Sequence, residues 1–153
     1  MYAIDFLMLQ RQLTHYGTER VFRRFPEEAY HWKPEKATYT AGEMLFHLVS
    51  VNCHIINHIR RALGHEVEFM EMEPLGSFEK ELRRFRELFY EHQDFLKTLT
   101  AEDFDKPVRY PEGGETSVGE LLHTLVAHEV HHRGQAHLYL LLYGLKQPQL
   151  WNY

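Results

Sequence analysis

The stretch that decides the fold runs from Thr116 to Tyr143 and reads TSVGELLHTLVAHEVHHRGQAHLYLLLY. Steps of three and four residues along it meet one helical face, made of Leu121, Leu125, His128, His132, Gln135 or Ala136, Tyr139 and Leu142. Apolar side chains at this spacing mark the side of a helix that packs inward. The stretch therefore predicts a long amphipathic helix with two histidines set into its buried face.

Two imidazoles in a buried face need partners, because a buried ring nitrogen without one costs free energy. His128 and His132 are four residues apart, so their Cβ atoms lie about 5–6 Å from each other on one side of the helix. This spacing allows both rings to bind one divalent cation. A third ligand has to come from another helix, and His47, two turns into its own predicted helix, is the best candidate. Three protein ligands leave a coordination position for water or substrate.

Working outward, three further segments carry helical periodicity: residues 2–24, 40–64 and 77–99. Thr40 with Glu43, and Ser117 with Glu120, have the spacing of capping boxes, which start two of the four helices. The connections between the helices are long and rich in proline and glycine. The sequence predicts an all-α four-helix bundle with long crossover loops, forming a single domain over residues 1–153.

The remaining segments carry weaker signals. In the first helix the expected inward stripe is Phe6, Leu9, Leu13, Tyr16 or Gly17, and Arg20 or Val21. Residues 65–76 form an acidic loop that would shape any pocket near it. Residues 107–110 are expected to be extended and to form half of a short hairpin closed through Gly113 and Gly114.

Composition excludes several classes of function. The chain has 17 Lys and Arg against 22 Asp and Glu, which gives a net charge of −5. This charge does not favour binding to nucleic acid. Cys53 is the one cysteine, which excludes an intramolecular disulfide and agrees with a reducing compartment. The first 17 residues lack a basic leader, and their apolar residues are interrupted by polar ones, so we expect neither a signal peptide nor a membrane span. These observations predict a cytoplasmic protein.

Other histidines compete for the same role. His54 and His58 have the same spacing, beside Cys53, and form an alternative site, although hydrogen-bonded surface or core histidines are the favoured interpretation. The residues assigned to the surroundings of the ion or to the substrate pocket are His131, Gln135 and Tyr139. His92 and His137 are treated as ordinary helix residues, with His92 on the inward stripe of its helix. His15, His31 and His65 lie in or near loop and helix-end positions and have no evident partner. Gly134 inside a helix predicts a close backbone approach.

The motif His128-Glu-Val-His-His132-Arg-Gly-Gln135, preceded by Ser117-Val-Gly-Glu-Leu-Leu and paired with a histidine in the second helix, resembles the DinB/YfiT-like superfamily. These are bacterial damage-inducible four-helix proteins, unrelated to the DNA polymerase that shares the DinB name. The resemblance implies a divalent metal, zinc or nickel first and iron or manganese next, on His47, His128 and His132. It also implies a homodimer formed through helix faces.

The resemblance suggests an enzyme, because better-understood relatives look like bacillithiol- or mycothiol-dependent transferases and others are described as metal-dependent hydrolases. The expected function is activation of a low-molecular-weight thiol or a water for attack on a small electrophile. Two alternatives stay open at this point. One is a non-catalytic stress-response protein in which the metal is structural, and the other is an all-α core without a metal, in which the rings hydrogen-bond to one another.

Overall fold

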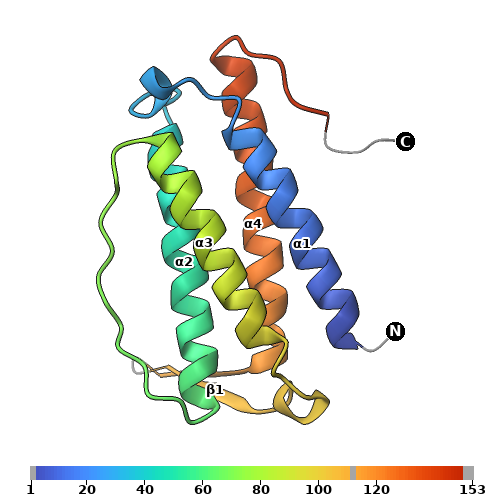
Figure 1. Ribbon diagram of the computed structural model, residues 1–153. Helices are drawn as coiled ribbons and strands as arrows, with labels where there is room; N and C mark the ends of the chain where they lie inside the picture. The colour runs from blue at the N-terminus through green and yellow to red at the C-terminus, as the bar shows by residue number, and fades with distance from the viewer. Residues whose placement is uncertain (1–2, 111–112, 150–153) are drawn as a thin grey trace.

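The computed structural model describes residues 3–110 and 113–149, and this part of the chain folds into a four-helix bundle (Figure 1). The helices are α1 (Ala3–Phe22), α2 (Ala41–Ala62), α3 (Phe78–Leu96) and α4 (Val118–Leu142). Helix α1 packs on α3 and α4, and α2 packs on the same two helices. The all-α class and the bundle predicted from the sequence are confirmed.

The connections set the direction of each helix. Residues 63–77 run back along the outside of the bundle, so α2 and α3 point the same way (Figure 1). Short 3-10 turns at Glu27–Ala29 and Ala101–Asp103 shape two other connections. The predicted hairpin is confirmed, because β1 (Pro107–Arg109) pairs antiparallel with β2 (Glu115–Ser117), with Val108 opposite Thr116.

Local chemistry fixes where two helices begin. Thr40 Oγ1 accepts a hydrogen bond from Glu43 N, and the Glu43 carboxylate accepts one from Thr40 N, at 3.1 and 2.7 Å. Ser117 and Glu120 form the same reciprocal pair at the start of α4. Each pair satisfies amide groups that the first helical turn leaves open. Both predicted capping boxes are therefore confirmed, and they fix the start of the two helices that carry the predicted metal ligands.

The core consists of two apolar clusters with a polar layer between them. One cluster includes Phe22, Leu45, Leu48, Phe85 and Leu140, and the other includes Ile56, Ile59, Leu96, Leu122 and Leu125. Between them along every helix lie buried polar side chains, which we call the central polar layer: Arg11, Thr14, His15, Thr18, Asn52, His92, Gln93, Glu129, His132 and Arg133. Burial of such groups is stable only when they bond to one another.

The central polar layer explains why the predicted orientation of α1 is wrong. Phe6, Leu9 and Leu13 are 55%, 44% and 51% exposed, whereas Arg11 and Thr18 on the opposite side of the helix are buried. The helix turns its polar side inward to supply partners for the buried groups of α3 and α4. An apolar stripe is therefore left on the outside of the bundle.

None of the described helices combines the length and the hydrophobicity that crossing a bilayer requires.

Candidate metal centre

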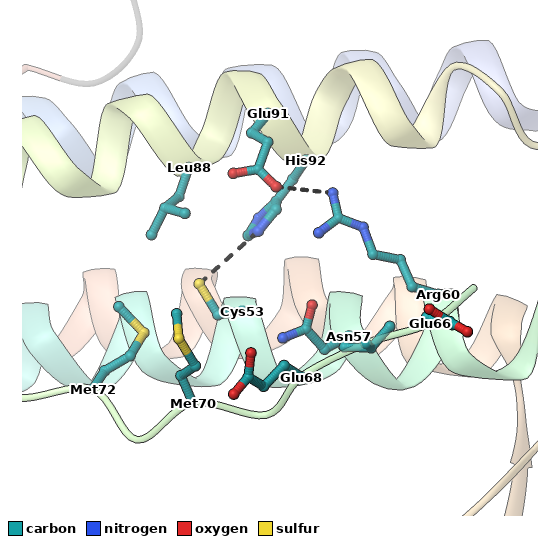
Figure 2. A pocket seen from close by; sticks show the side chains of 11 residues that line it. Cys53, Asn57, Arg60, Glu66, Glu68, Met70, Met72, Leu88, Glu91 and His92 are labelled. Carbon is teal, nitrogen blue, oxygen red and sulfur yellow. Dashed lines mark hydrogen bonds and ion pairs between the residues drawn. The ribbon is translucent and has the colours of Figure 1, made fainter.

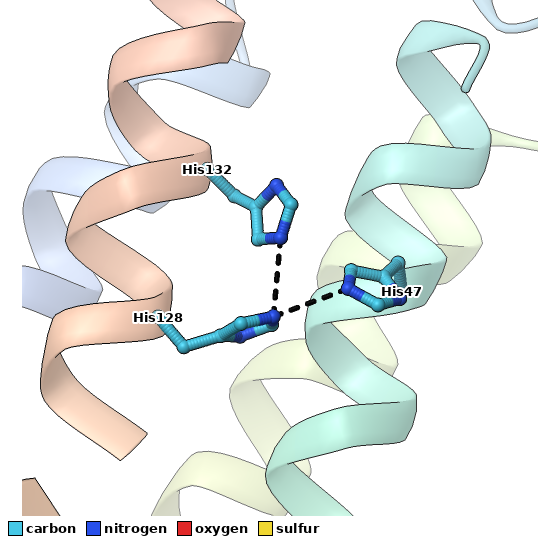
Figure 3. A group of neighbouring side chains, drawn as sticks. All are labelled: His47, His128 and His132. Atoms are coloured by element: carbon cyan, nitrogen blue, oxygen red, sulfur yellow. Dashed lines mark hydrogen bonds between the residues drawn. The ribbon is translucent and has the colours of Figure 1, made fainter. Parts of the chain in front are cut away.

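Three imidazoles from two neighbouring helices face one another inside the bundle (Figure 3). His47 lies on α2, and His128 and His132 lie one turn apart on α4. His128 Nε2 is 3.1 Å from His47 Nε2 and 3.1 Å from His132 Nε2. One nitrogen from each ring lies within 4.8 Å of the other two. The structure therefore brings together the three histidines that the sequence selects.

The spacing of these nitrogens fits a single metal ion. Zinc–nitrogen bonds of about 2.0–2.1 Å at a tetrahedral angle place two ligand nitrogens about 3.3 Å apart. The two shorter separations in the cluster differ from this value by a few tenths of an ångström. Small rotations of the rings would therefore bring all three nitrogens into coordination distance.

Proton positions also favour a cation. Gln135 Oε1 can only accept, so His132 Nδ1, 2.6 Å away, donates to it and His132 Nε2 presents a lone pair. His128 Nε2 faces that lone pair and His47 Nε2 as well. In a neutral cluster His128 Nε2 either donates to one of these nitrogens or accepts from His47, so one of the two contacts is left without a hydrogen bond. A divalent cation between the rings satisfies all three lone pairs.

Burial keeps the three rings neutral, which is the form that binds metals. Burial, followed by the nearby His132, His47 and His131, lowers the pKa of His128 to about 4. Burial is also the main cause that lowers the pKa of His47 and of His132. At neutral pH each ring therefore keeps one nitrogen with a free lone pair.

Neighbouring side chains hold two of the rings in place. Gln135 orients His132 through the hydrogen bond described above. The ring of Tyr39 stacks on His47 with centroids 5.0 Å apart and an interplanar angle of 21°. Tyr139 donates from its hydroxyl to the backbone oxygen of Tyr39 at 3.0 Å. Both Gln135 and Tyr139 therefore support the cluster from outside it, as groups around a metal often do.

Comparison with known proteins gives this arrangement a context. The model of the DinB superfamily matches residues 12–136, most of the chain and all three histidines. The chain belongs to the DinB superfamily. Members of this superfamily bind metals in general, and no curated protein is similar enough to this chain to count as a match.

Two solved DinB-like proteins share the fold. One from Bacillus cereus is 21% identical, with a TM-score of 0.79, over 99% of this chain and 100% of that one. Another from Bacillus subtilis is 16% identical, with a TM-score of 0.74, over 96% of this chain and 99% of that one. At these identities the likeness concerns the fold alone.

The structure places the other histidines of this DinB protein away from the cluster or at its edge. His131 is exposed, and its ring centroid is 5.0 Å from that of His132. His54 and His58 form a hydrogen-bonded pair with their Nε2 atoms 2.9 Å apart, and Arg61 donates to His58 Nδ1. In the described part of the chain, no third His, Cys, Asp or Glu joins that pair.

Two expectations about single residues, those for His15 and Gly134, are wrong. His15 is fully buried in the middle of α1 and stacks on Phe89 with centroids 3.8 Å apart. His92 is buried, as its place on the inward stripe of α3 predicts, and it contacts Arg11 and Cys53. Gly134 has no close neighbour, because no atom of the described chain lies within 4 Å of the position that a Cβ would take. Neither ring nitrogen of His15 has a hydrogen-bond partner in the described chain, so this ring is held by stacking, and Gly134 faces outward.

Glu129, which the sequence analysis did not single out, lies at the centre of the polar layer. Its carboxyl group is fully buried, and burial raises its pKa to about 7. Four neighbours act in the opposite direction and lower the pKa, in decreasing order Thr18, Arg11, Asn52 and Arg133. A signal was present in the sequence, because Glu129 follows Leu125 by four residues and so shares its inward face. Through these neighbours Glu129 links α1, α2 and α4, one residue along the chain from His128.

Proposed function

We propose that this DinB protein is a metal-dependent enzyme in which His47, His128 and His132 hold one divalent cation, zinc or nickel first. Support comes from one observation, that three nitrogens converge and none of the other described His, Cys, Asp or Glu residues completes the set. An ion with three protein ligands keeps a position for an exogenous ligand. The non-catalytic alternative, a closed site that ties α2 to α4, would need a fourth protein ligand there.

A cavity of about 460 Å³ opens beside the cluster, a size typical of small-molecule sites. Residues that line it include Thr38, Tyr39, His132, Gln135, Leu138 and Tyr139. Lys36 adds a positive charge, and none of the described residues lining the cavity is a carboxylate. Small substrates with an apolar body and a negatively charged group fit this lining.

The proposed reaction is transfer of a low-molecular-weight thiol of the bacillithiol type to a small electrophile, with hydrolysis as the second candidate. A divalent cation at the three histidines would lower the pKa of a thiol or a water towards neutrality. Gln135 and Tyr39 keep the rings in position, and Leu138 and Leu142 give the cavity apolar surface against which a bound substrate would displace water. Exclusion of water strengthens the electrostatic effect of any charge in the cavity.

The proposal is tested by following conjugation of a low-molecular-weight thiol to a chromogenic aryl halide, with zinc-loaded, nickel-loaded and chelator-treated protein. Lewis-acid stabilisation is worth several kcal/mol, so we expect the rate to fall about 100-fold or more when the metal is removed. An ester substrate without added thiol distinguishes hydrolysis. A rate that does not depend on the metal for either substrate would contradict the proposal.

Gln135→Leu should weaken metal binding without removing a ligand. The variant has a similar volume but cannot accept the proton of His132 Nδ1, so the ring loses its fixed tautomer. Loss of such a supporting bond typically costs about 10- to 100-fold in metal affinity. Competition with a zinc chelator measures the change, and the exposed Gln12→Leu serves as the control for a glutamine far from the cluster.

We further propose a homodimer formed by the outward faces of α1 and α4, which pack side by side. The exposed apolar residues are Phe6, Leu9, Leu13 and Tyr16 on α1, and Val130, Leu138, Leu141 and Leu142 on α4. Gly134 lies on the same face of α4 as Val130 and Leu138, and it leaves room for a partner helix to approach closely. Leu138 also lines the substrate cavity, so a partner on this face would narrow its mouth.

Leu13→Glu combined with Leu138→Glu should convert the dimer to a monomer, because it places four buried charges in a symmetric interface. Light scattering after size exclusion should give twice the chain mass of 18.4 kDa for the wild type, and the mass of one chain for the variant. Leu75→Glu, at an exposed leucine outside both helices, should leave the dimer intact. A monomeric wild type would contradict the proposed interface.

We place the protein in the cytoplasm. Its one cysteine, Cys53, is a free thiol, and a reducing compartment keeps it in that form.

A further inference from the structure

A second cavity, of about 350 Å³, lies on another side of α2, between α2, α3 and residues 66–72 (Figure 2). It shares no lining residue with the cavity beside the three histidines. Helix α2 contributes Cys53, and α3 contributes Leu88 and His92. This cavity has no part in the function proposed above.

The segment that covers the cavity contributes five lining residues. Glu66, Glu68, Met70 and Met72 are separated by steps of two residues, and Val67 lines the cavity as well. In an extended chain, residues two apart face the same side. Within the described chain, no backbone hydrogen bond outside regular structure involves residues 66–72, so this segment can adjust to an occupant.

Three sulfur-bearing side chains line this cavity, and one of them, Met70, is 74% exposed at its open side. The Cys53 side chain points from α2 towards α3, and the side chains of Met70 and Met72 rise from the loop towards Cys53 (Figure 2). Thiolate and thioether sulfur are soft ligands, which select monovalent copper over hard cations. Two methionines and a cysteine on one cavity therefore differ in kind from the three imidazoles of the first site.

His92 supports the cysteine from the far side. Its Nδ1 faces an Arg11 guanidinium nitrogen at 3.4 Å, and a guanidinium can only donate, so Nδ1 accepts and Nε2 carries the proton. That Nε2 lies 4.0 Å from Cys53 Sγ. The N–H group thus points at the sulfur, where it would stabilise a thiolate that binds a metal.

The charges around the cavity favour a cation. Arg60 is paired with Glu91 at 3.0 Å, which leaves Glu66 and Glu68 as the net charge of the lining. Burial is the main cause that raises the pKa of Cys53 to about 11, so the thiol stays protonated and is no nucleophile on its own. A soft cation that binds the sulfur would displace this proton.

We propose that Cys53, Met70 and Met72 form a binding site for a soft monovalent cation, Cu(I), with His92 as a positioning residue that donates to the sulfur. On binding, the Cys53 S–H bond breaks, a Cu–S bond forms and the proton passes to solvent, with no change in oxidation state. The site is separate from the three-histidine cluster and does not depend on its chemistry.

The test uses the full chain carrying His128→Ala, which removes the competing imidazole site, and Cu(I) supplied without oxygen against a Cu(I) chelator. We expect one Cu(I) per chain. Met70→Leu with Met72→Leu keeps the volume of the lining. Because outer supporting groups alone are worth about 10- to 100-fold in metal affinity, loss of two direct ligands should weaken binding about 100-fold or more.

A second readout follows the sulfur itself. Since Cys53 is the one thiol of the chain, its reaction with a thiol reagent reports the site directly. One equivalent of Cu(I) should block that reaction, and a tenfold excess of zinc should not. Met8 lies outside the cavity, so adding Met8→Leu to the His128→Ala protein should not change either result. Unchanged affinity in the double methionine variant, or a thiol that Cu(I) leaves reactive, would overturn the proposal.

Discussion

His128→Ala should abolish retention of the divalent cation while leaving the helix content unchanged. His128 Nε2 is the nitrogen that lies 3.1 Å from both other rings, so its loss leaves His47 and His132 without a shared centre. The side chain is only half-buried, so the fold itself should lose little. Elemental analysis of protein purified without a His-tag, together with circular dichroism, measures both effects.

Thermal unfolding with and without metal tests the same prediction through the free energy of unfolding. A ligand at 100 times its dissociation constant stabilises the folded state by about 2.7 kcal/mol. The wild type should show this gain and His128→Ala should not. His131→Ala is the matched control, because it removes an exposed imidazole three residues away and should keep the cation. Full metal occupancy in His128→Ala would count against the assignment.

Glu129→Ala should cause the largest loss of stability. The carboxyl group is fully buried among Arg11, Arg133, Thr18 and Asn52, and its removal leaves two buried guanidinium groups without their counter-charge. Breaking a buried charge pair costs about 3–5 kcal/mol. We expect the lower end, about 3 kcal/mol, since burial raises the pKa of Glu129 to about 7 and part of the population is already neutral.

Urea unfolding of metal-free protein measures this loss, so that effects on metal binding are kept apart. Glu87→Ala serves as the control, because Glu87 is an exposed residue of α3. Surface substitutions of this kind stay within about 0.5 kcal/mol. A loss below about 1 kcal/mol in Glu129→Ala would mean that the central polar layer does not depend on its carboxyl group.

The sequence predicted those parts of the fold that depend on local chemistry. The capping boxes at Thr40 and Ser117 fix helix starts through bonds within four residues, and the hairpin depends on a short turn. Helical periodicity also placed His128 and His132 on one face. These features require no knowledge of which helix lies beside which.

The orientation of α1 could not be predicted in the same way. The stripe through Leu9 and Leu13 satisfies the rule for a buried face, yet the helix turns the other way. The reason lies in partners distant in sequence: Arg11 donates to Gln93 at 2.7 Å, and Arg133 lies within 3.5 Å of the Thr14 carbonyl oxygen. Only the packed bundle reveals these partners, so periodicity within one helix gave the wrong face.

X-ray absorption spectroscopy of the zinc-loaded wild-type protein tests the central claim most directly. The account predicts one zinc per chain with three imidazole nitrogens at about 2.0–2.1 Å and one further light atom that exchanges with added thiol. A first shell with a fourth protein ligand, with sulfur from Cys53, or with fewer than three imidazoles would contradict it.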